Sequence, residues 1–284
     1  MTQVLETRSI EPFGIEAGLF YQSSASDADR AELARLYMHD GLLVARDLTL
    51  TMEEQRELCG AFGPVPDSPY ENFYVSNTRA DGFLGTKELQ WHIDVPYLPS
   101  PYLVGALHAI DVDPDAASTR FVSGFRAYDN LPESLKTRVE GMKALQVRQR
   151  LSERANRLED LQAGDLCTVH PVVRMQAGTG RRYLFVNENM TASIIGLSAS
   201  DSDALLGELF SYLYAEDAIY DHVWRPGDLV VWDNLSVQHA RGQAGAGART
   251  LQRVTCTQYT YAEQYPADSV GEDLHNITLF APAD

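Results

Sequence analysis

The chain has 284 residues, 44% of them hydrophobic and 22% charged, which is typical of a globular protein and excludes a disordered or fibrous one. Acidic residues outnumber lysines and arginines by 40 to 23, so the formal net charge is −17, which disfavours nucleic acid and anionic membranes as partners. The N-terminal residues carry no signal-peptide pattern, and Cys59, Cys167 and Cys256 are too scattered for a disulfide framework. We expect a cytoplasmic protein with one domain, residues 1–284.

Helical signals come first along the chain. Ser26 can cap a helix that ends near Gly41, and the apolar residues 42–45 then predict a strand. A capping box formed by Thr51 and Glu54 predicts a second helix, which ends near residue 63. The polar, turn-rich residues 70–89 predict a long loop, and loops of this length in compact domains are usually functional.

Short apolar segments dominate the rest of the chain. They predict strands at residues 91–95, 102–110, 119–122, 169–175, 183–187, 220–224, 229–232 and 251–261. Two helices interrupt them, one after Pro132 and one beginning near Ser200. Many short strands without regular strand–helix alternation predict a mainly β protein with flanking helices, a sandwich or barrel rather than a nucleotide-binding parallel sheet.

The pair His92 and Asp94 is the first candidate for a metal site. In a strand, side chains two positions apart point to the same face, so both could reach one ion. With His239 further along the chain, they would form the two-histidine, one-carboxylate set typical of non-haem Fe(II) sites. A chain of this composition contains about one such pair by chance, so an ordinary pair on a surface strand is the alternative.

Arg249 and Arg253 form a second candidate group, downstream of His239. They lie four positions apart and would share one face of a strand. Two arginines on the inner face of a barrel are costly unless they bind anions, such as the carboxylates of a dicarboxylic acid. A solvated strand end is the alternative interpretation.

These residues belong to a longer pattern that resembles the taurine dioxygenase and phenoxyacetate dioxygenase (TauD/TfdA) family of Fe(II)/2-oxoglutarate-dependent oxygenases. The matching blocks, in order, are WHID at 91–94, HPVVR at 170–174 with GRRYLFVNE at 180–188, WRPGDLVVWDN at 224–234 running to His239, and Arg249 with Arg253. The resemblance spans about residues 15–262. It implies a double-stranded β-helix, or jelly-roll barrel, with flanking helices.

The resemblance also implies roles for individual residues. The implied Fe(II) ligands are His92, Asp94 and His239. Thr119 and Arg249 are expected to hold the distal carboxylate of 2-oxoglutarate. Arg253 is expected near the oxoacid end and the substrate, with both a catalytic and a co-substrate-binding role. Family members often carry Gly-Gly-Asp-Thr where this chain has AAST at 116–119, so the threonine is kept without its turn glycines.

Positions that contact the substrate in relatives fall at Tyr70, Glu88, Gln90, Tyr97, Arg148 and Met190. An acid at 88 and a base at 148 would suit a zwitterionic or polar substrate. Arg150, Arg154 and Arg157 follow Arg148 at helical spacing, so a solvated cationic face is the alternative for that residue. The remaining histidines His39, His222 and His275 are expected at the surface.

The resemblance implies a dioxygenase that uses Fe(II), 2-oxoglutarate and O2 to hydroxylate a small polar or anionic molecule, releasing succinate and CO2. Desaturation or cyclisation is the alternative outcome within this class. A zinc hydrolase on a similar barrel would leave Arg249 and Arg253 unexplained, and a non-catalytic jelly-roll binding module would not need three intact metal ligands. Because relatives often self-associate, a homo-oligomer is expected, with no nucleic acid or membrane partner.

Overall fold

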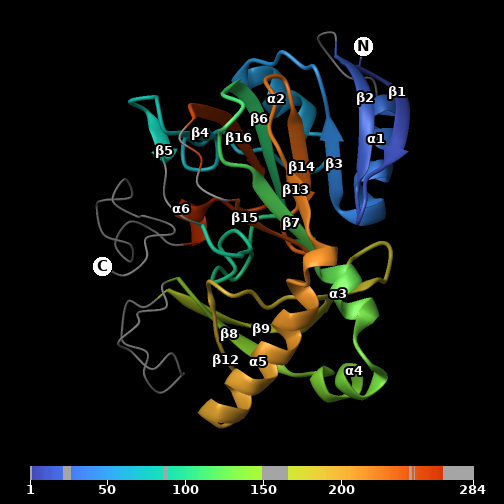
Figure 1. Ribbon diagram of the computed structural model, residues 1–284, viewed down its shortest axis with the longest axis vertical. Coiled ribbons are helices and arrows are strands. Elements are labelled where there is room, and N and C mark those ends of the chain that lie inside the picture. The colour runs from blue at the N-terminus through green and yellow to red at the C-terminus, as the bar shows by residue number, and fades with distance from the viewer. Residues whose placement is uncertain are drawn as a thin grey trace.

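The computed structural model describes residues 2–21, 27–85, 89–148, 166–242, 245 and 247–264, and it is mainly β with helices at its edges, as predicted (Figure 1). The largest sheet has eight strands. In spatial order they are β1 (Thr2–Ser9), β2 (Ile15–Tyr21), β3 (Leu42–Ala45), β14 (Leu229–Asp233), β6 (Val104–Val112), β16 (Arg249–Cys256), β4 (Phe73–Ser76) and β5 (Gly82–Leu84). Strands β2 and β3 pair in parallel, as do β4 and β5, and the other neighbours are antiparallel.

Three smaller sheets complete the β structure. The sheet most important for the site consists of β13 (Tyr220–His222), β7 (Thr119–Ser123) and β15 (Val237–Arg241), because it carries Thr119 and His239. The second consists of β12 (Thr191–Ile194), β8 (Lys143–Val147) and β9 (Cys167–Pro171). The third pairs β10 (Val173–Met175) with β11 (Arg182–Leu184). All these pairings are antiparallel.

The helices lie in two groups. Helices α1 (Asp27–Asp40) and α2 (Met52–Cys59) cover one face of the large sheet. Helices α3 (Gly124–Asn130), α4 (Glu133–Val139) and α5 (Ala199–Leu213) gather at the lower end of the molecule in Figure 1, near β8, β9 and β12. The single turn α6 (Tyr261–Gln264) follows β16. No helix among the described segments is long and apolar enough to cross a membrane.

The capping box at the start of α2 is confirmed. Thr51 Oγ1 accepts a hydrogen bond from the backbone N–H of Glu54, and the Glu54 carboxylate accepts one from the backbone N–H of Thr51. The helix ends at Cys59, before the predicted end near residue 63, because the next backbone bonds span three residues and tighten the turn. The predicted strand at 42–45 matches β3, whereas Ser26 lies outside the described residues.

Strand β14 separates the two layers of the core. All its residues are buried, because both faces of the sheet are covered. Leu229 and Val231 pack with the residues of α1 and α2, while Val230 and Trp232 pack on the other side. This alternation follows from the two-residue period of a strand. The Trp232 indole lies against Gly105 on the neighbouring β6, and a Cβ at Gly105 would come 2.2 Å from it.

Several sequence predictions about secondary structure are wrong in detail: residues 169–175 form the separate strands β9 and β10, and the strand predicted at 251–261 ends at Cys256. Two further differences lie next to the predicted metal site. Residues 91–95 do not form a strand: their backbone makes one isolated bridge, between His92 and His239, and Val95 has a φ of 48°, outside the extended region. Residues 70–89 are not simply a loop, because β4 and β5 lie within them and β4 pairs with β16. Both strands are short and are separated by polar, turn-forming residues, which is why sequence analysis assigned the whole stretch to a loop.

We predict that Gly105→Ala destabilises the protein, because the added methyl group overlaps the Trp232 indole. Overpacking of this kind typically costs about 1–3 kcal/mol in the free energy of unfolding. Gly207→Ala is the matched control: Gly207 is exposed within α5, a Cβ there meets nothing within 4 Å, and the change should stabilise the protein by about 0.5–1 kcal/mol. Urea unfolding measures both, and equal stability changes would contradict this account of the packing.

Candidate metal centre

Two backbone hydrogen bonds bring the two predicted histidine ligands together. The His92 N–H donates to the His239 carbonyl, and the His239 N–H donates to the His92 carbonyl, both at 3.0 Å. His239 lies in the middle of β15, so its position is set by the sheet that contains β7. The two imidazole rings lie 4.1 Å apart between centroids. The histidines therefore meet through this single bridge and not through the strand that the sequence predicted.

Asp94 completes the group. Its Oδ1 lies 3.6 Å from His92 Nε2 and 3.9 Å from His239 Nε2. All three side chains are buried, and one possible ligand atom from each lies within 4.8 Å of the others. An ion about 2.1 Å from each ligand would place the ligand atoms roughly 3–4 Å apart. The predicted ligand set thus fits a metal ion held by two imidazoles and one carboxylate, with its remaining coordination positions open.

The hydrogen bond of the His92 ring and the burial of the His239 ring both favour metal binding. His92 Nδ1 donates to the Gln90 carbonyl at 2.7 Å, which leaves the proton off Nε2, the nitrogen nearest Asp94. Burial, together with the nearby His92 ring, lowers the pKa of His239 well below its ordinary value. A neutral imidazole is the form that donates a lone pair to a metal, so His239 is ready to coordinate at neutral pH.

The Asp94 carboxylate is ionised in spite of its burial. Burial opposes ionisation, but the adjacent Arg253 guanidinium, the strongest opposing influence, holds the pKa of Asp94 well below its usual range. Arg253 Nη2 donates to Asp94 Oδ2 at 2.7 Å, so Oδ1 remains the oxygen that faces the imidazoles. The structure therefore places Arg253 against one of the predicted metal ligands, a contact that the sequence did not predict.

Asn234 anchors the backbone of Asp94. Its side-chain oxygen accepts from the Asp94 N–H at 2.8 Å, and its side-chain nitrogen donates to the carbonyls of Asp94 and Tyr102 at 3.1 and 2.9 Å. Asn234 is fully buried in the turn between β14 and β15. Asn234 belongs to the sequence block at 224–234. Only the fold shows that it holds the segment 91–95, which carries the predicted ligands His92 and Asp94.

Thr119 and Arg249 lie together at the start of β7 and of β16. Arg249 Nη2 donates to Thr119 Oγ1 at 2.8 Å, and its Nε makes no hydrogen bond to any residue that the structure describes. No acid in the described part of the chain pairs with Arg249, and burial, with some contribution from Arg241, lowers the pKa of Arg249 to about 9. A buried guanidinium with unused donors is suited to an anionic ligand, because a carboxylate would restore the lost solvation.

A single cavity joins these groups. Its walls come from the large sheet and from the β13–β7–β15 sheet. The residues that line it are Phe73, Val75, Leu84, Leu89, His92, Asp94, Val95, Tyr102, Leu107, Thr119, Trp232, His239, Ala240, Arg241, Arg249 and Arg253. Arg249 and Arg253 both face it, which confirms that positions four apart share one face of β16. Tyr102 and Arg241 were missed by sequence analysis, since a lone tyrosine or arginine in a strand carries no distinguishing signal.

The predicted substrate positions are only partly brought together. Tyr97 and Met190 are buried in one cluster with Tyr102, which lines the cavity. Arg148 is close enough to Tyr261 of the same cluster to influence its pKa. Tyr70 is half-buried and Gln90 is exposed, and neither lines the cavity. Glu88, Arg150, Arg154 and Arg157 lie outside the described residues. The substrate roles of these positions stay predictions.

One of the remaining histidines contradicts its predicted location. His222 was expected at the surface but is 1% exposed, because β13 lies beside β7 and the ring packs on Trp224. The side chain of His39 is 68% exposed, as predicted. His275 falls outside the described part of the chain.

Comparison with known proteins identifies relatives. The family described as taurine catabolism dioxygenase TauD, TfdA family matches residues 6–255. An (S)-phenoxypropionate/alpha-ketoglutarate dioxygenase from Sphingobium herbicidovorans is 32% identical over 238 residues, covering 75% of this chain and 80% of the relative. An alpha-ketoglutarate-dependent 2,4-dichlorophenoxyacetate dioxygenase from Cupriavidus pinatubonensis is 28% identical over 250 residues, covering 79% and 87%.

Solved structures share the fold. A taurine dioxygenase from Burkholderia xenovorans matches with a TM-score of 0.75 at 22% identity, covering 90% of this chain and 91% of that one. The protein AAD-2, solved in complex with Mn(II) and N-oxalylglycine, matches with a TM-score of 0.75 at 20% identity, covering 91% and 99%. Together with the match over residues 6–255, these findings show that the chain belongs to the TauD/TfdA family and is a dioxygenase that depends on Fe(II) and 2-oxoglutarate.

Proposed function

We propose that this dioxygenase hydroxylates a small polar or anionic organic molecule and releases succinate and CO2 from 2-oxoglutarate. The observation that carries the proposal is that one cavity holds both the buried triad and Arg249, a buried guanidinium with no acid partner among the described residues. The triad supplies a metal site, and Arg249 supplies a site for the far carboxylate of a dicarboxylic oxoacid.

Each residue of the site has a proposed task. His92, Asp94 and His239 would hold Fe(II), which together with 2-oxoglutarate would activate O2 for attack on a C–H bond. Thr119 and Arg249 would bind the distal carboxylate of the oxoacid. The apolar side chains of Phe73, Val75 and Leu107 line the same cavity, where they would keep bulk water from the reacting centre. Asn234 would keep the Asp94 backbone fixed while the ligands exchange.

Arg253 is proposed to contact the oxoacid end or the substrate while it holds Asp94. Its Nη2 binds the Asp94 carboxylate, and the guanidinium lies over the Phe73 ring at 4.9 Å. A guanidinium has five N–H donors, so further donors remain for a carboxylate or a similar anion. Two relatives are named for phenoxypropionate and dichlorophenoxyacetate, both carboxylates, and a third is named alkylsulfatase. This supports an anionic group on the substrate.

The wider organisation is likewise a proposal. We propose one domain over residues 1–284 with a double-stranded β-helix, in which the large sheet and the β13–β7–β15 sheet face each other across the cavity. We further propose a homo-oligomer in the cytoplasm that binds a small molecule. We also propose that it does not bind nucleic acid, and the net charge of −17 supports this last point. Desaturation or cyclisation would use the same site, and product analysis would distinguish them from hydroxylation.

We predict that the apo-protein, mixed anaerobically with Fe(II) and 2-oxoglutarate, develops the weak visible charge-transfer band of the metal–oxoacid chelate. His92→Ala should abolish the band, because two ligands are too few to hold the ion in place. His39→Ala is the matched control, because this histidine is exposed and is not a predicted ligand. The band of this variant should equal that of the wild type. Absence of the band in the wild type, or a Zn(II)-dependent hydrolytic activity without 2-oxoglutarate, would refute the proposal.

We predict that Arg249→Gln raises the KM for 2-oxoglutarate by about 10–100-fold, the usual effect of losing a hydrogen bond to a charged group. The lost contact is with the distal carboxylate, so binding of metal alone should not change. Arg182→Gln is the control, because Arg182 lies at the surface beside Glu140, and its KM should stay within twofold of the wild type. Succinate release measures both variants. An unchanged KM in Arg249→Gln would remove this residue from the co-substrate site.

A further inference from the structure

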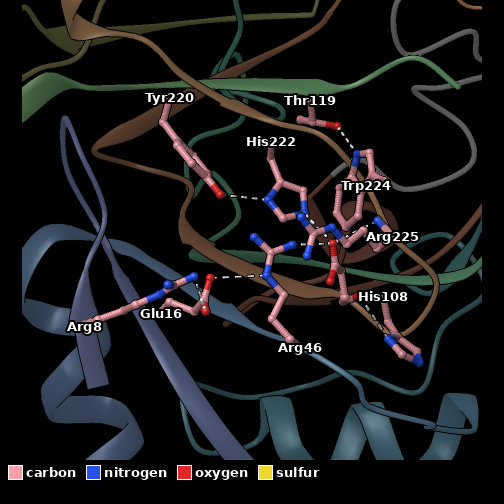
Figure 2. Close-up of polar contacts among 10 residues, drawn as sticks. Arg8, Glu16, Arg46, His108, Thr119, Tyr220, His222, Trp224 and Arg225 are labelled. Carbon is pink, nitrogen blue, oxygen red and sulfur yellow. Dashed lines mark hydrogen bonds and ion pairs between the residues drawn. The ribbon is translucent and has the colours of Figure 1, made fainter. Parts of the chain in front are cut away.

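The indole of Trp224 lies beside the proposed carboxylate site without lining the cavity. Trp224 follows β13 and is 4% exposed. Its Nε1–H donates to Thr119 Oγ1 at 2.9 Å, a contact drawn in Figure 2. Arg249 Nη2 donates to the same oxygen at 2.8 Å, and the Arg249 guanidinium lies 5.9 Å from the centre of the indole. Trp224 therefore contacts both residues of the proposed site.

The two donors determine where the Thr119 proton points. A threonine hydroxyl has one proton to donate and two lone pairs to accept with. Trp224 and Arg249 occupy both lone pairs, so the O–H must be directed toward a third group. Within the described residues no acceptor bonds to this O–H, and Thr119 lines the cavity. The hydroxyl is thus held as a donor for a ligand, beside the donors of Arg249.

We propose that Trp224 is a positioning residue for 2-oxoglutarate: its indole N–H orients the Thr119 hydroxyl so that the distal carboxylate receives a hydrogen bond from Thr119 as well as from Arg249. This inference rests on the proposed function and extends it to a residue outside the cavity. Without the indole, one lone pair of the Thr119 oxygen would lack a hydrogen-bond donor. The hydroxyl proton would then no longer have one preferred direction.

A buried polar network holds the indole in place (Figure 2). The His222 ring packs edge-on against Trp224, with centroids 4.5 Å apart and an interplanar angle of 77°. His222 Nε2 donates to Asp228 Oδ2 at 3.1 Å, since an ionised carboxylate can only accept, and Nδ1 then accepts from the Tyr220 hydroxyl at 2.9 Å. Burial lowers the pKa of His222, so the ring stays neutral in this single tautomer.

Asp228 ties this network to the rest of the fold. Its Oδ2 also accepts from Arg46 Nη1 at 2.6 Å and from the backbone N–H of Arg225 at 2.9 Å. Arg46 in turn contacts Glu16 at 3.2 Å. Strands β2, β3 and β13 and the turn before β14 are thereby linked to one carboxylate. His222 and Asp228 at the centre of the network are buried and hydrogen-bonded to each other, which makes them rigid, and that rigidity is transmitted to the indole by direct packing of the His222 ring.

Trp224→Phe tests the proposal, because it removes the N–H and keeps an aromatic ring against His222 and Arg249. Binding is measured by anaerobic titration calorimetry of the Fe(II)-loaded protein with 2-oxoglutarate and with pyruvate, which has the oxoacid end but no distal carboxylate. The dissociation constant for 2-oxoglutarate is expected to rise about 3–10-fold, the effect of one neutral hydrogen bond, with that for pyruvate changing less than twofold. Equal changes for both ligands, or no change for either, would overturn the proposal.

A double-mutant cycle with Thr119→Val asks whether Trp224 acts through Thr119. In the Thr119→Val background, Trp224→Phe should change 2-oxoglutarate binding by less than twofold, because the hydroxyl is already gone. Full additivity would overturn the proposal. If Trp224→Phe does not fold, a comparison of Thr119→Val with Thr119→Ser provides a second test. Thr119→Val must weaken 2-oxoglutarate binding. Thr119→Ser keeps the hydroxyl, so its affinity for 2-oxoglutarate must stay within about threefold of the wild type.

Controls separate this inference from the proposed function. Ser202→Ala removes a buried hydroxyl that bonds the Ile194 N–H at 2.9 Å in another part of the molecule, so it should lower stability and leave both affinities unchanged. A wild-type protein that binds pyruvate as tightly as 2-oxoglutarate would refute the distal-carboxylate site itself, and with it this inference. If the wild type binds 2-oxoglutarate more tightly than pyruvate, and Trp224→Phe keeps the same ratio of the two affinities, only the role of Trp224 would be refuted.

Discussion

The backbone pairing of His92 with His239 is the constraint on which the rest of the site depends. A metal ion tolerates errors of only a few tenths of an ångström in ligand position, and long flexible segments cannot supply that accuracy by side-chain rotation alone. The two backbone hydrogen bonds between His92 and His239 fix the position of the segment 91–95 as a sheet would, but only at His92. Asn234, in the turn that leads into β15, then fixes Asp94, so β15 and the turn before it position all three predicted ligands.

The distribution of charge follows from the same arrangement. The protein as a whole carries a formal charge of −17, yet the described lining of the cavity contains Arg241, Arg249 and Arg253 against the single acid Asp94. Buried guanidinium groups are costly when unpaired and favourable when an anion binds them. The Arg253 guanidinium already has Asp94 as a partner, whereas the Arg249 guanidinium hydrogen-bonds only to a hydroxyl among the described residues. A carboxylate bound at Arg249, as proposed, would offset the cost of that burial.

One face of the large sheet packs in an apolar core, and the other face borders the cavity of the candidate site. On one face, Leu229 and Val231 pack with α1 and α2 into an apolar core. On the other, Trp232 packs against Gly105 and borders the cavity that holds the triad. The polar network around Asp228 lies beyond that cavity and supports Trp224 and Thr119. A rigid layer therefore backs the site on each side, as is needed for side chains that must keep their geometry while ligands exchange.

Several features could be predicted from the chain alone, because they depend on local pattern. Apolar periodicity predicted β3, β14 and most of the strands, the Thr51 capping box predicted the start of α2, and positions four apart predicted that Arg249 and Arg253 share a face. The pair His92 and Asp94 was also identified, but through a strand that does not form. That prediction succeeded because the spacing is short, which keeps the two side chains close in many backbone conformations.

The residue types of the metal centre, its likeness to a dioxygenase family and the mainly β class were determined by the sequence itself, since they depend on residue identity, order and short-range spacing. Only the tertiary structure decided that Asn234 holds Asp94, that Arg253 pairs with that ligand, and that His222 is buried behind Trp224. These contacts join segments that are distant in the chain. Their geometry is set by sheet pairing and packing, for which a linear pattern carries no signal.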